Sequence, residues 1–485
     1  MEVSLDTVVA WAKRRWFAYP GSDIYGWLAN ARDLGPYGVE IKRNIEEVRW
    51  NYFVRERDDV IWLDSQILMN PKVREASGHV WWFSDPLVDC KKCKSRERAD
   101  KLIEEKLTDL TRPKTYEEML NNEEVIKKLK ILIDEKKTPE SWDFTEQFLF
   151  LNVWKVKCPK CWSCDWTEPK KFNLMFKTQQ WIVEWEWTDI YLRPETAQWI
   201  FVNFKNILDT TRSRIPFGIA QIWKSFRNEI TPGNFMFRVR EFYQMEIEYF
   251  VENNEEIWLK AFEEWKAESK KRWKEEIWIK EEKMRFRDHD KDELSFYSKW
   301  TCDVEYLFPR GWWELQWIAY RTDYDLKQHM QFSGKDLQYN DPYTGKRYVP
   351  HCIEPSRGLT RAILTAMIDA YDEEKYTDGN GNEQTRVVAR FHKNIAPVKF
   401  AIMPLVKKDE NMVKFAHDLY KKLSKQYMCE YDDSGNIGKS YRRQDEIWTP
   451  YCITVDHQTL TDGTVTIRDR DTMEQKRIKP EEITL

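Results

Sequence analysis

Apolar and polar positions divide the chain into four stretches with different periods. Residues 1–85 begin with an amphipathic helix, MEVSLDTVVAWAKRRW, and continue through a loop into a second helix, VEIKRNIEEVRWNYFVRER, before a strand-like stretch that ends at Pro86. Residues 86–170 read as a separate unit with a highly charged helical stretch at 100–137. We find no apolar run near the ~20 residues that cross a bilayer and no signal peptide, so we expect no membrane partner.

The third stretch, residues 171–385, alternates strand patterns with helices and carries a charged helical insertion at 255–295. Within it, the turn-rich sequence DGNGNEQTR at 378–386 predicts a linker. Residues 395–485 predict a small α/β domain that ends in a hairpin turning at Asp462–Gly463.

Composition narrows the class of protein. Apolar residues make up 41% and charged residues 33% of the chain, which is typical of a folded protein. A net charge of −4 excludes a globally basic nucleic-acid binder but allows a local basic groove. Tryptophan, with 25 residues, outnumbers glycine, with 16. An average chain has ~7% glycine, which would be about 34 here.

Four of the nine cysteines form two CxxC pairs, Cys90/Cys93 and Cys158/Cys161. Paired CxxC knuckles suit tetrahedral Zn²⁺, and in a reducing compartment they favour metal over disulfides. We therefore predict a structural zinc site with these four ligands. Cys164 is a candidate replacement for one of them, and reduced cysteines without metal are the alternative.

The stretch from residue 226 to 250 carries an unusual array of charge. FRNEI (226–230) and FRVREFYQMEIEYF (237–250) predict two antiparallel strands joined by a TPGNF loop. Period-2 alternation puts one set of charged and polar residues on a single face: Arg238, Arg240, Gln244, Glu246 and Glu248. Such an array is costly in a core unless the charges meet a ligand or one another, and arginine suits phosphate. An ion-pair ladder on a solvated face is the alternative. We expect Phe242 on the opposite face, so that its stacking on adenine would need a bulge or a local twist.

A second chemical segment is IEPSRGLTRAILTAMIDAYDEE, residues 353–374. It predicts a short strand with Glu354 and Ser356, a turn at Gly358 and a helix that carries Arg361 in its first turn. The helix dipole opposes a cation there, so Arg361 needs an anionic partner such as phosphate.

These segments resemble the class II aminoacyl-tRNA synthetases. FRNEI…FRVREF is similar to motif 2 and EPSRGLTRAIL to motif 3, whereas YLRPETAQ, FVNFKNIL, MEIEYF, AYRTDYDL, YDDSGNIG and YRRQDEI resemble the dimeric glycyl-tRNA synthetases from about residue 5 to 480. GPYGVEIKRNI through SGHVWWFSDP resembles motif 1, which builds the dimer interface in that family. The resemblance implies an α+β fold with an antiparallel catalytic sheet flanked by helices, an insertion domain and a C-terminal α/β anticodon-binding domain. It also implies a cytoplasmic homodimer.

The implied activity is ATP-dependent conversion of glycine to glycyl-adenylate, followed by transfer to the 3′ end of tRNA(Gly). Such chemistry needs positioning and charge neutralisation. The implied catalytic residues are Arg227 on the α-phosphate and carboxylate, Arg238 on ATP, and Arg361 on the γ-phosphate. Phe242 is implied to stack on adenine and Glu314 to lie near Mg²⁺. Other implied ATP contacts are Asn228, Glu229, Phe237, Val239, Arg240, Glu241, Leu315, Gly358, Leu359 and Thr360.

Glycine has no side chain, so its site must recognise the ammonium group and exclude larger amino acids. The resemblance implies that Glu195, Glu246 and Glu354 bind the ammonium group, that Ser356 narrows the pocket and that Arg98 contacts substrate from the insertion. Taken alone, Glu195 reads better as a helix-start carboxylate favoured by the dipole. Further implied glycine contacts are Phe242, Tyr243, Gln244, Met245, Pro355, Arg357 and Gly358. In the C-terminal domain, Arg442–Asp445 suit phosphate or base contacts, with a solvated helix as the alternative.

Tryptophan stands where the family has glycine. Trp199, Trp223, Trp317 and Trp448 are such positions, and Trp27, Trp62, Trp162 and Trp313 look similar, whereas Trp50 and Trp312 fit as tryptophan. A ring at a site that needs close backbone approach or positive φ is strained, and overpacking alone costs ~1–3 kcal/mol per site. We therefore predict that UGA codons of the gene encode glycine and are written as tryptophan in the sequence. UGG codons at positions 199, 223 and 317 would refute this prediction, and a degenerate synthetase-like protein with a blocked pocket is the alternative.

Two other functions remain open. One is a non-catalytic, synthetase-like RNA-binding or accessory protein, against which the retained Arg227, Arg238 and Arg361 argue. The other is a ligase for another small amino acid, such as alanine or serine, which Ser356 and the three carboxylates disfavour.

Overall fold

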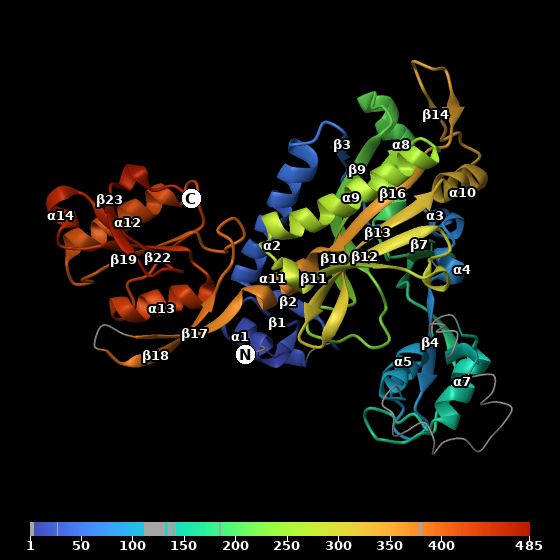
Figure 1. Cartoon of the computed structure of the whole chain (residues 1–485), viewed down its shortest axis with the longest axis horizontal. Coiled ribbons are helices and arrows are strands. Elements are labelled where there is room, and N and C mark those ends of the chain that lie inside the picture. Colours follow the sequence, from blue (N-terminus) through green and yellow to red (C-terminus); the bar gives the residue numbers. More distant parts are fainter. Residues whose placement is uncertain are drawn as a thin grey trace.

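A computed structural model describes residues 4–26, 28–110, 131–133, 139, 142–183, 186–377 and 381–485. The chain forms a central body with an insertion below it and a C-terminal domain beside it (Figure 1). Most of the charged stretch expected to be helical at 100–137 lies outside the described residues, as does Trp27. None of the described helices combines the length and apolar character needed to cross a membrane.

The central body is built on a mixed sheet whose strands follow the order β11-β12-β13-β16-β10-β9-β3 within the described residues. All neighbours pair antiparallel except β3 and β9, which are parallel. The strands are β3 (Val60–Trp62), β9 (Phe217–Phe226), β10 (Glu241–Val251), β11 (Met284–Asp288), β12 (Trp300–Phe308), β13 (Gly311–Thr322) and β16 (His351–Gly358).

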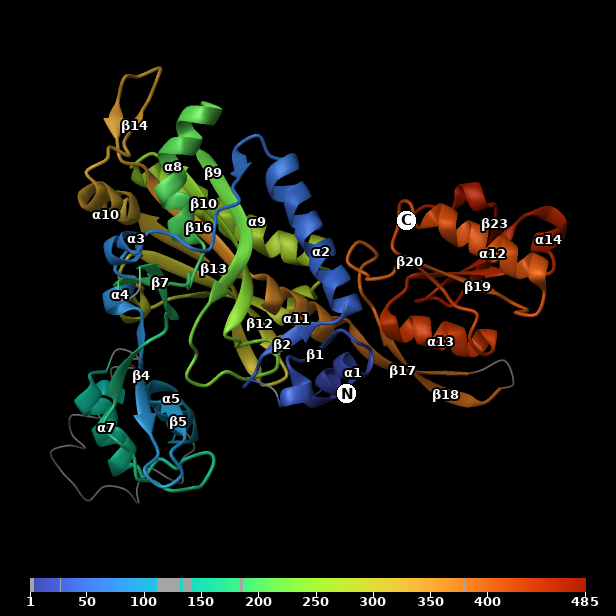
Figure 2. The ribbon, with the colours of Figure 1, turned by 180° about the vertical axis from the view of Figure 1, so that it is seen from behind.

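Helices cover the two faces of this sheet unequally. On one face, Met245 and Ile247 of β10 and Ile353 of β16 enter a core with α2 (Pro36–Trp50), α9 (Glu255–Glu276) and α11 (Leu359–Ala370). On the other face, Phe250 and Cys352 pack against α8 (Ala197–Thr211) and α10 (Tyr324–Ser333) (Figure 2). The part of this second face that α8 and α10 leave uncovered carries the polar residues of the candidate site.

Shorter elements connect these layers. α1 (Leu5–Arg14) packs near α11, and α2 continues into a π-helical turn at Asn51–Arg55. The others in this body are β1 (Ala18–Pro20), β2 (Arg32–Leu34), α3 (Lys72–Ala76), α4 (His79–Trp82), β7 (Lys177–Val183), β8 (Glu186–Tyr191), β14 (Tyr339–Asn340) and β15 (Arg347–Tyr348).

The loop between β9 and β10 differs from its sequence prediction. FRNEI was expected to be a strand, but β9 ends at Phe226 and β10 begins only at Glu241. Positive φ angles at Asn234 and Phe235 break the extended backbone. The prediction that alternation aligns Arg238 and Arg240 with the strand face is therefore wrong, because both lie in the loop. Gln244, Glu246 and Glu248 do share one face of β10, as predicted.

The insertion has its own small core. β4 (Ser84–Asp89) lies between β5 (Arg96–Arg98) and β6 (Lys170–Asn173), and α5 (Ala99–Leu110) packs against α7 (Phe144–Val153). Val88, Ile103, Phe150 and Trp166 are buried between these elements.

The C-terminal domain is a sheet of order β20-β19-β21-β22-β23 with flanking helices. Its elements are β19 (Phe400–Pro404), α12 (Glu410–Leu423), β20 (Cys429–Tyr431), α13 (Ile437–Ile447), β21 (Tyr451–Val455), α14 (Thr459–Asp462), β22 (Val465–Asp469) and β23 (Gln475–Ile478). The predicted hairpin at Asp462–Gly463 is wrong, because Asp462 ends α14 and Gly463 caps it with φ +73°. The hairpin turn follows Asp469 instead.

A second hairpin joins the body to this domain. β17 (Tyr371–Thr377) pairs with β18 (Glu383–Ala389), so the described end of the segment predicted as a linker, residues 383–386, is strand. Residues 378–380 lie outside the described part.

Candidate functional site

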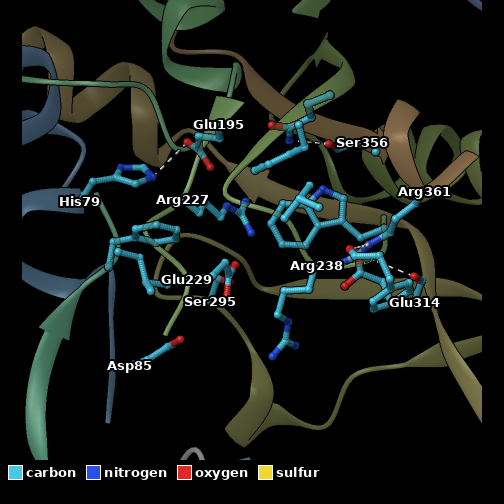
Figure 3. A pocket seen from close by; sticks show the side chains of 18 of the residues that line it. His79, Asp85, Glu195, Arg227, Glu229, Arg238, Ser295, Glu314, Ser356 and Arg361 are labelled. Carbon is cyan, nitrogen blue, oxygen red and sulfur yellow. Dashed lines mark hydrogen bonds and ion pairs between the residues drawn. The ribbon is translucent and has the colours of Figure 1, made fainter. Parts of the chain in front are cut away.

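A cavity of about 520 Å³ opens on the uncovered part of the second sheet face. Its walls come from the loop between β9 and β10, the strands β10, β13 and β16, the first turn of α11 and the stretch from α4 to β5. Arg227, Arg361 and Glu195, which sequence reasoning expected to share a site, line this one cavity (Figure 3).

Three guanidinium groups face the cavity: Arg238 and Arg361 lie at one end, and Arg227 lies between them and Glu195 (Figure 3). Arg227 Nε donates to the Pro194 carbonyl oxygen at 3.0 Å, and its guanidinium lies 5.3 Å from the ring centre of Phe242. Arg361 donates to Glu314 Oε1 at 2.8 Å and lies 4.4 Å from the ring of Phe237. No side chain in the described part of the chain pairs with the guanidinium of Arg238. Three cations around a water-accessible cavity attract an anion with several charges.

Phe242 lines the cavity together with Gln244. Both pair regularly with β9, Phe242 with Ser225 and Gln244 with Trp223, and no register shift interrupts this pairing. The expectation that Phe242 needs a bulge is wrong, because residues two apart on a strand share a face.

Glu195 marks the opposite end, just before α8. Its Oε1 lies 3.1 Å from His79 Nε2, and the Arg74 guanidinium donates to its backbone carbonyl. Burial opposes ionisation of Glu195, but His79, Arg321 and Arg74 together hold its pKa well below the usual value. The carboxylate is therefore a fixed negative charge at neutral pH.

Glu246 and Glu354 lie beneath the cavity instead of in its wall. Ser356 Oγ and Gln244 Nε2 donate to Glu246 Oε1 at 3.0 and 2.7 Å, so the two residues that do line the cavity connect it to Glu246. Glu354 accepts from Arg321 at 2.9 Å. Burial raises the pKa of Glu246 and raises that of Glu354 still further.

Sequence reasoning missed His79, Arg74 and Arg321. Arg321 is fully buried and joins Asp325 to Glu354, with 2.9 Å bonds to each. The sequences AYRTDYDL and SGHVWWFSDP contain Arg321 and His79, but neither has a charge pattern of its own that separates them from surface residues.

Most of the predicted site residues line the cavity, and the rest lie around it. Those in the lining are Arg98, Glu195, Arg227, Glu229, Phe237, Arg238, Val239, Phe242, Gln244, Glu314, Ser356, Arg357, Gly358, Thr360 and Arg361. Those outside it are Asn228, Arg240, Glu241, Tyr243, Met245, Glu246, Leu315, Glu354, Pro355 and Leu359.

The residues outside the lining have other contacts. Met245, Leu315 and Leu359 are buried in the core on the α9 side of the sheet. Glu241 pairs with Lys224, and Arg240 donates to the Glu229 carbonyl at 3.2 Å. Within the lining, Arg357 directs its guanidinium to Glu276 of α9 at 3.0 Å.

Comparison with known proteins decides the family. Residues 181–371 match the tRNA synthetase class II core domain (G, H, P, S and T), residues 85–174 match the glycyl-tRNA synthetase insertion domain 1, and residues 399–484 match an anticodon binding domain. The glycine–tRNA ligase of Acetivibrio thermocellus is 52% identical over 100% of this chain and 98% of its own length. The chain belongs to the glycine–tRNA ligase family. The ligases of Clostridium kluyveri and Geobacillus kaustophilus are 52% and 51% identical, each over 99% of this chain and 97% of their own lengths.

The class II fold predicted for this ligase is confirmed, with its core, its insertion and its anticodon-binding domain. In that last domain, Asp445 is buried and accepts from Arg386 and Arg468 at 2.8 Å each. Gln444 is also buried and donates to Glu430. The interpretation of these two residues as RNA contacts is therefore wrong, because they hold the ligase's interior together.

The insertion of the ligase brings Cys90, Cys93, Cys158 and Cys161 together, with all four Sγ atoms within 4.8 Å of one another. Cys90 and Cys161 Sγ are 3.5 Å apart, and Cys93 and Cys158 Sγ are 3.6 Å apart. Zinc–sulfur bonds of about 2.3 Å in a tetrahedron imply sulfur separations of about 3.8 Å, close to these values. Cys164 lies outside this cluster and donates to the Lys155 carbonyl.

Proposed function

We propose that the cavity is where this ligase joins glycine to AMP and then to tRNA(Gly). The observation that carries the proposal is the separation of charge across one cavity, with Arg238 and Arg361 at one end, the Glu195 carboxylate at the other and Arg227 between them. A polyphosphate suits the first end and an ammonium group the second. The two ends of a glycyl-adenylate carry these groups.

In the first step, a glycine carboxylate oxygen attacks the α-phosphorus of ATP, the bond to the β-phosphate oxygen breaks, and pyrophosphate leaves. Arg227 lies between the two ends and neutralises charge on the reacting carboxylate and α-phosphate. Arg361 binds the departing phosphates from the first turn of α11, and Phe242 stacks on adenine. In the second step, the terminal tRNA hydroxyl attacks the glycyl carbonyl carbon, and AMP leaves.

The glycine end selects by charge and size. Glu195 binds the ammonium group directly, and Ser356 bounds the space where a larger side chain would lie. Glu246 and Glu354 act from beneath the cavity, through Ser356 and Arg321. In this proposal Glu195 and Ser356 contact glycine directly. The buried carboxylates of Glu246 and Glu354 orient the residues closer to the cavity.

Mg²⁺ fits the arginine end of the cavity. Glu314 and Glu229 both line it and offer carboxylate oxygens, which are the ligands that Mg²⁺ prefers together with phosphate oxygens and water. These two residues would hold the ion, which when bound neutralises charge on the phosphates. The Arg361–Glu314 contact keeps the carboxylate at that end.

The four clustered cysteines fit Zn²⁺, and the zinc would tie the two ends of the insertion together. Cys158→Ser removes one ligand, so it should abolish the roughly one equivalent of zinc per chain that metal analysis of the purified ligase should find. Cys164→Ser, which changes a cysteine outside the cluster, should leave zinc unchanged. A wild-type chain without zinc, or equal loss in both variants, would contradict this proposal.

The ligase acts in the cytoplasm as a homodimer formed through the region that resembles motif 1. Directly before this region, Ile24, Tyr25 and Leu28 are exposed apolar side chains with 65–89% of their surface accessible. Asn30, two residues later, donates to the carbonyl oxygens of Gly233 and Arg238 in the active-site loop. A partner covering this segment would therefore support the loop that carries Arg238.

ATP–pyrophosphate exchange tests the activity directly. We expect exchange that depends on glycine and is absent with alanine or serine. Arg227→Ala should abolish it, whereas Arg442→Ala, on the surface of the C-terminal domain, should not change it. Exchange with alanine or serine at the glycine rate would contradict the assignment of the small end of the cavity.

A further inference from the structure

We infer that the working ligase carries glycine where the sequence has tryptophan at a set of structurally identifiable positions, and that position 317 determines whether glycine enters the cavity. The second part rests on the proposed function. The backbone singles out four of these positions and the surroundings of the cavity single out three more: Trp16, Trp162, Trp278 and Trp448, and Trp199, Trp223 and Trp317.

The backbone at several tryptophans has a conformation that favours glycine. Among the described residues, thirteen that are not glycine have positive φ, and four of them are tryptophans: Trp16, Trp162, Trp278 and Trp448, with φ between 59° and 82°. Tryptophan makes up 25 of 485 residues, so chance would place about one there. A bulky side chain is strained in this region, whereas glycine adopts it freely. Trp16 and Trp278 had no such signal in the sequence.

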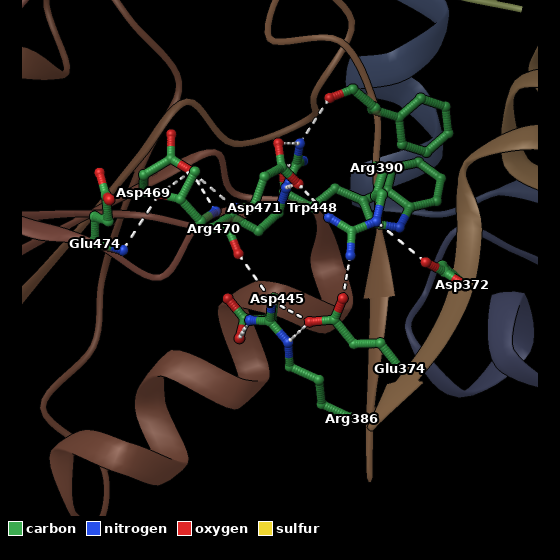
Figure 4. Close-up of polar contacts among 12 residues, drawn as sticks. Asp372, Glu374, Arg386, Arg390, Asp445, Trp448, Asp469, Arg470, Asp471 and Glu474 are labelled. Carbon is green, nitrogen blue, oxygen red and sulfur yellow. Dashed lines mark hydrogen bonds and ion pairs between the residues drawn. The ribbon is translucent and has the colours of Figure 1, made fainter. Parts of the chain in front are cut away.

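Trp448 shows most clearly how a bulky side chain conflicts with a backbone conformation that favours glycine. It caps the C-terminus of α13 with φ 82°, the position where helices commonly end with glycine. Its side chain is completely buried, yet no described residue accepts a hydrogen bond from its Nε1. The ring centre lies 3.4 Å from that of Phe391 at an angle of 53°, below the 4.5–7 Å that aromatic pairs prefer. Figure 4 shows Trp448 beside Arg390, Arg470 and Asp471, and both arginines form ion pairs with Asp471.

Trp317 lies beside Ser356 in the wall of the cavity. In the sheet, Ser356 lies directly opposite Glu246 on one side and Trp317 on the other. Side chains of directly opposed residues lie on the same face about 5 Å apart. The indole of Trp317 therefore stands on the same surface as the serine that bounds the glycine end, and it lines the cavity. Glycine at 317 would leave that surface to the substrate.

Trp223 and Trp199 lie beside residues of the glycine end, and the Trp199 indole donates to the Gln66 carbonyl. Trp223 lies opposite Gln244, and its buried Nε1 has no acceptor among the described residues. Trp199 is buried in α8 with its ring 4.3 Å from the guanidinium of Arg74, which donates to Glu195. Trp223 thus lies beside Gln244, which contacts Ser356. Trp199 lies beside Arg74, which contacts Glu195. Trp62 and Trp313 have no positive φ, and their strand partners are Ala220 and Tyr306 instead of residues of the glycine end, so neither their backbone nor their position singles them out.

Glycine at all these positions has one economical explanation, a gene in which UGA is read as glycine. Moving tryptophans into the glycine count would also bring both residue types toward their usual frequencies. The same reading requires a tRNA(Gly) with an anticodon complementary to UGA, which this ligase would itself charge.

The decisive experiment combines codons, peptide masses and activity. We expect UGA at the seven positions, and peptides from the source cells that are lighter by the difference between a tryptophan and a glycine residue. Three full-length versions are then compared in glycine-dependent ATP–pyrophosphate exchange: the printed sequence, a version with all seven changes, and a version with six changes that keeps Trp317. The seven-change version should be active, and keeping Trp317 should lower exchange at least about 100-fold without altering the fold by circular dichroism.

The outcomes separate the two claims. UGG codons, or tryptophan in the peptides, would overturn the glycine assignment. Equal exchange by the six-change and seven-change versions would overturn the role of position 317. A third outcome is UGA codons and light peptides, but a folded seven-change version without glycine-dependent exchange. This outcome would support the glycine assignment and refute the proposed function.

Discussion

Replacing Trp448 with glycine should stabilise the protein, which is the opposite of what a buried tryptophan normally predicts. Truncating a large core aromatic typically costs ~3–5 kcal/mol of unfolding free energy. Here the left-handed backbone costs ~1–2 kcal/mol for a non-glycine residue. The unpaired buried indole N–H adds ~1–3 kcal/mol and overpacking against Phe391 another ~1–3 kcal/mol. Because the rings of Trp11, Phe17 and Phe391 contact the indole of Trp448, we expect them to move into part of the space that it leaves.

We therefore expect Trp448→Gly to raise the free energy of unfolding by about 1–3 kcal/mol in urea titrations followed by circular dichroism. Trp273→Ala is the matched control. Trp273 is equally buried, but it sits in the regular helix α9 and its Nε1 donates to Gln316 at 2.8 Å. This control should lose ~3–5 kcal/mol. If Trp448→Gly destabilises the chain by more than ~1 kcal/mol, the reasoning about its backbone and packing is refuted.

Three further predictions concern the cavity, a buried lysine and the dimer. Arg361→Ala should lower kcat/KM for ATP in the exchange assay ~100–1000-fold, and a loss below about tenfold would show that Arg361 does not bind the phosphates. Burial lowers the pKa of Lys399 to about 7, although Glu40 and Glu47 oppose this shift. Below pH 7 the folded state must hold a buried charge, which lowers the free energy of unfolding. This penalty is relieved as the pH rises from 7 toward 10.5, because Lys399 is then neutral in the folded state but still charged in the unfolded state. The free energy of unfolding of the wild type should therefore rise between pH 7 and 9 by up to ~1.4 kcal/mol per pH unit. Lys399→Met should remove this part of the pH dependence. An unchanged slope in Lys399→Met would contradict a buried, uncharged Lys399. In sedimentation experiments Ile24→Asp should weaken the dimer, whereas Phe332→Asp on the exposed side of α10 should not, and equal effects would exclude the segment before motif 1 as the interface.

Local sequence was enough to place the strand and helix of residues 351–370. Glu354 and Ser356 alternate with apolar residues on β16, Gly358 precedes α11, and Arg361 falls in its first turn, all as expected. The signal is local because a strand, a glycine and a helix follow one another directly. The burial of the Glu354 side chain could not be predicted from this segment, because α8 and α10, which cover this face of the sheet, come from distant parts of the chain.

The loop between β9 and β10 could not be predicted by alternation. Arg238 and Arg240 continue the period of β10, but Asn234 and Phe235 turn the chain before them, and pairing with β9 starts only at Glu241. His79 and Arg321 were missed for another reason. Each acts on a carboxylate far away in the sequence, so only the tertiary structure reveals its partner.

The account depends on one arrangement, in which a phosphate end and an ammonium end share a single cavity. A crystal structure of the seven-change protein with a non-hydrolysable glycyl-adenylate analogue tests it most directly. The account predicts the ammonium nitrogen within hydrogen-bond distance of Glu195, the phosphate mimic beside Arg227 and the adenine on Phe242. An analogue bound with its ammonium group away from Glu195, or in a different cavity, would contradict it.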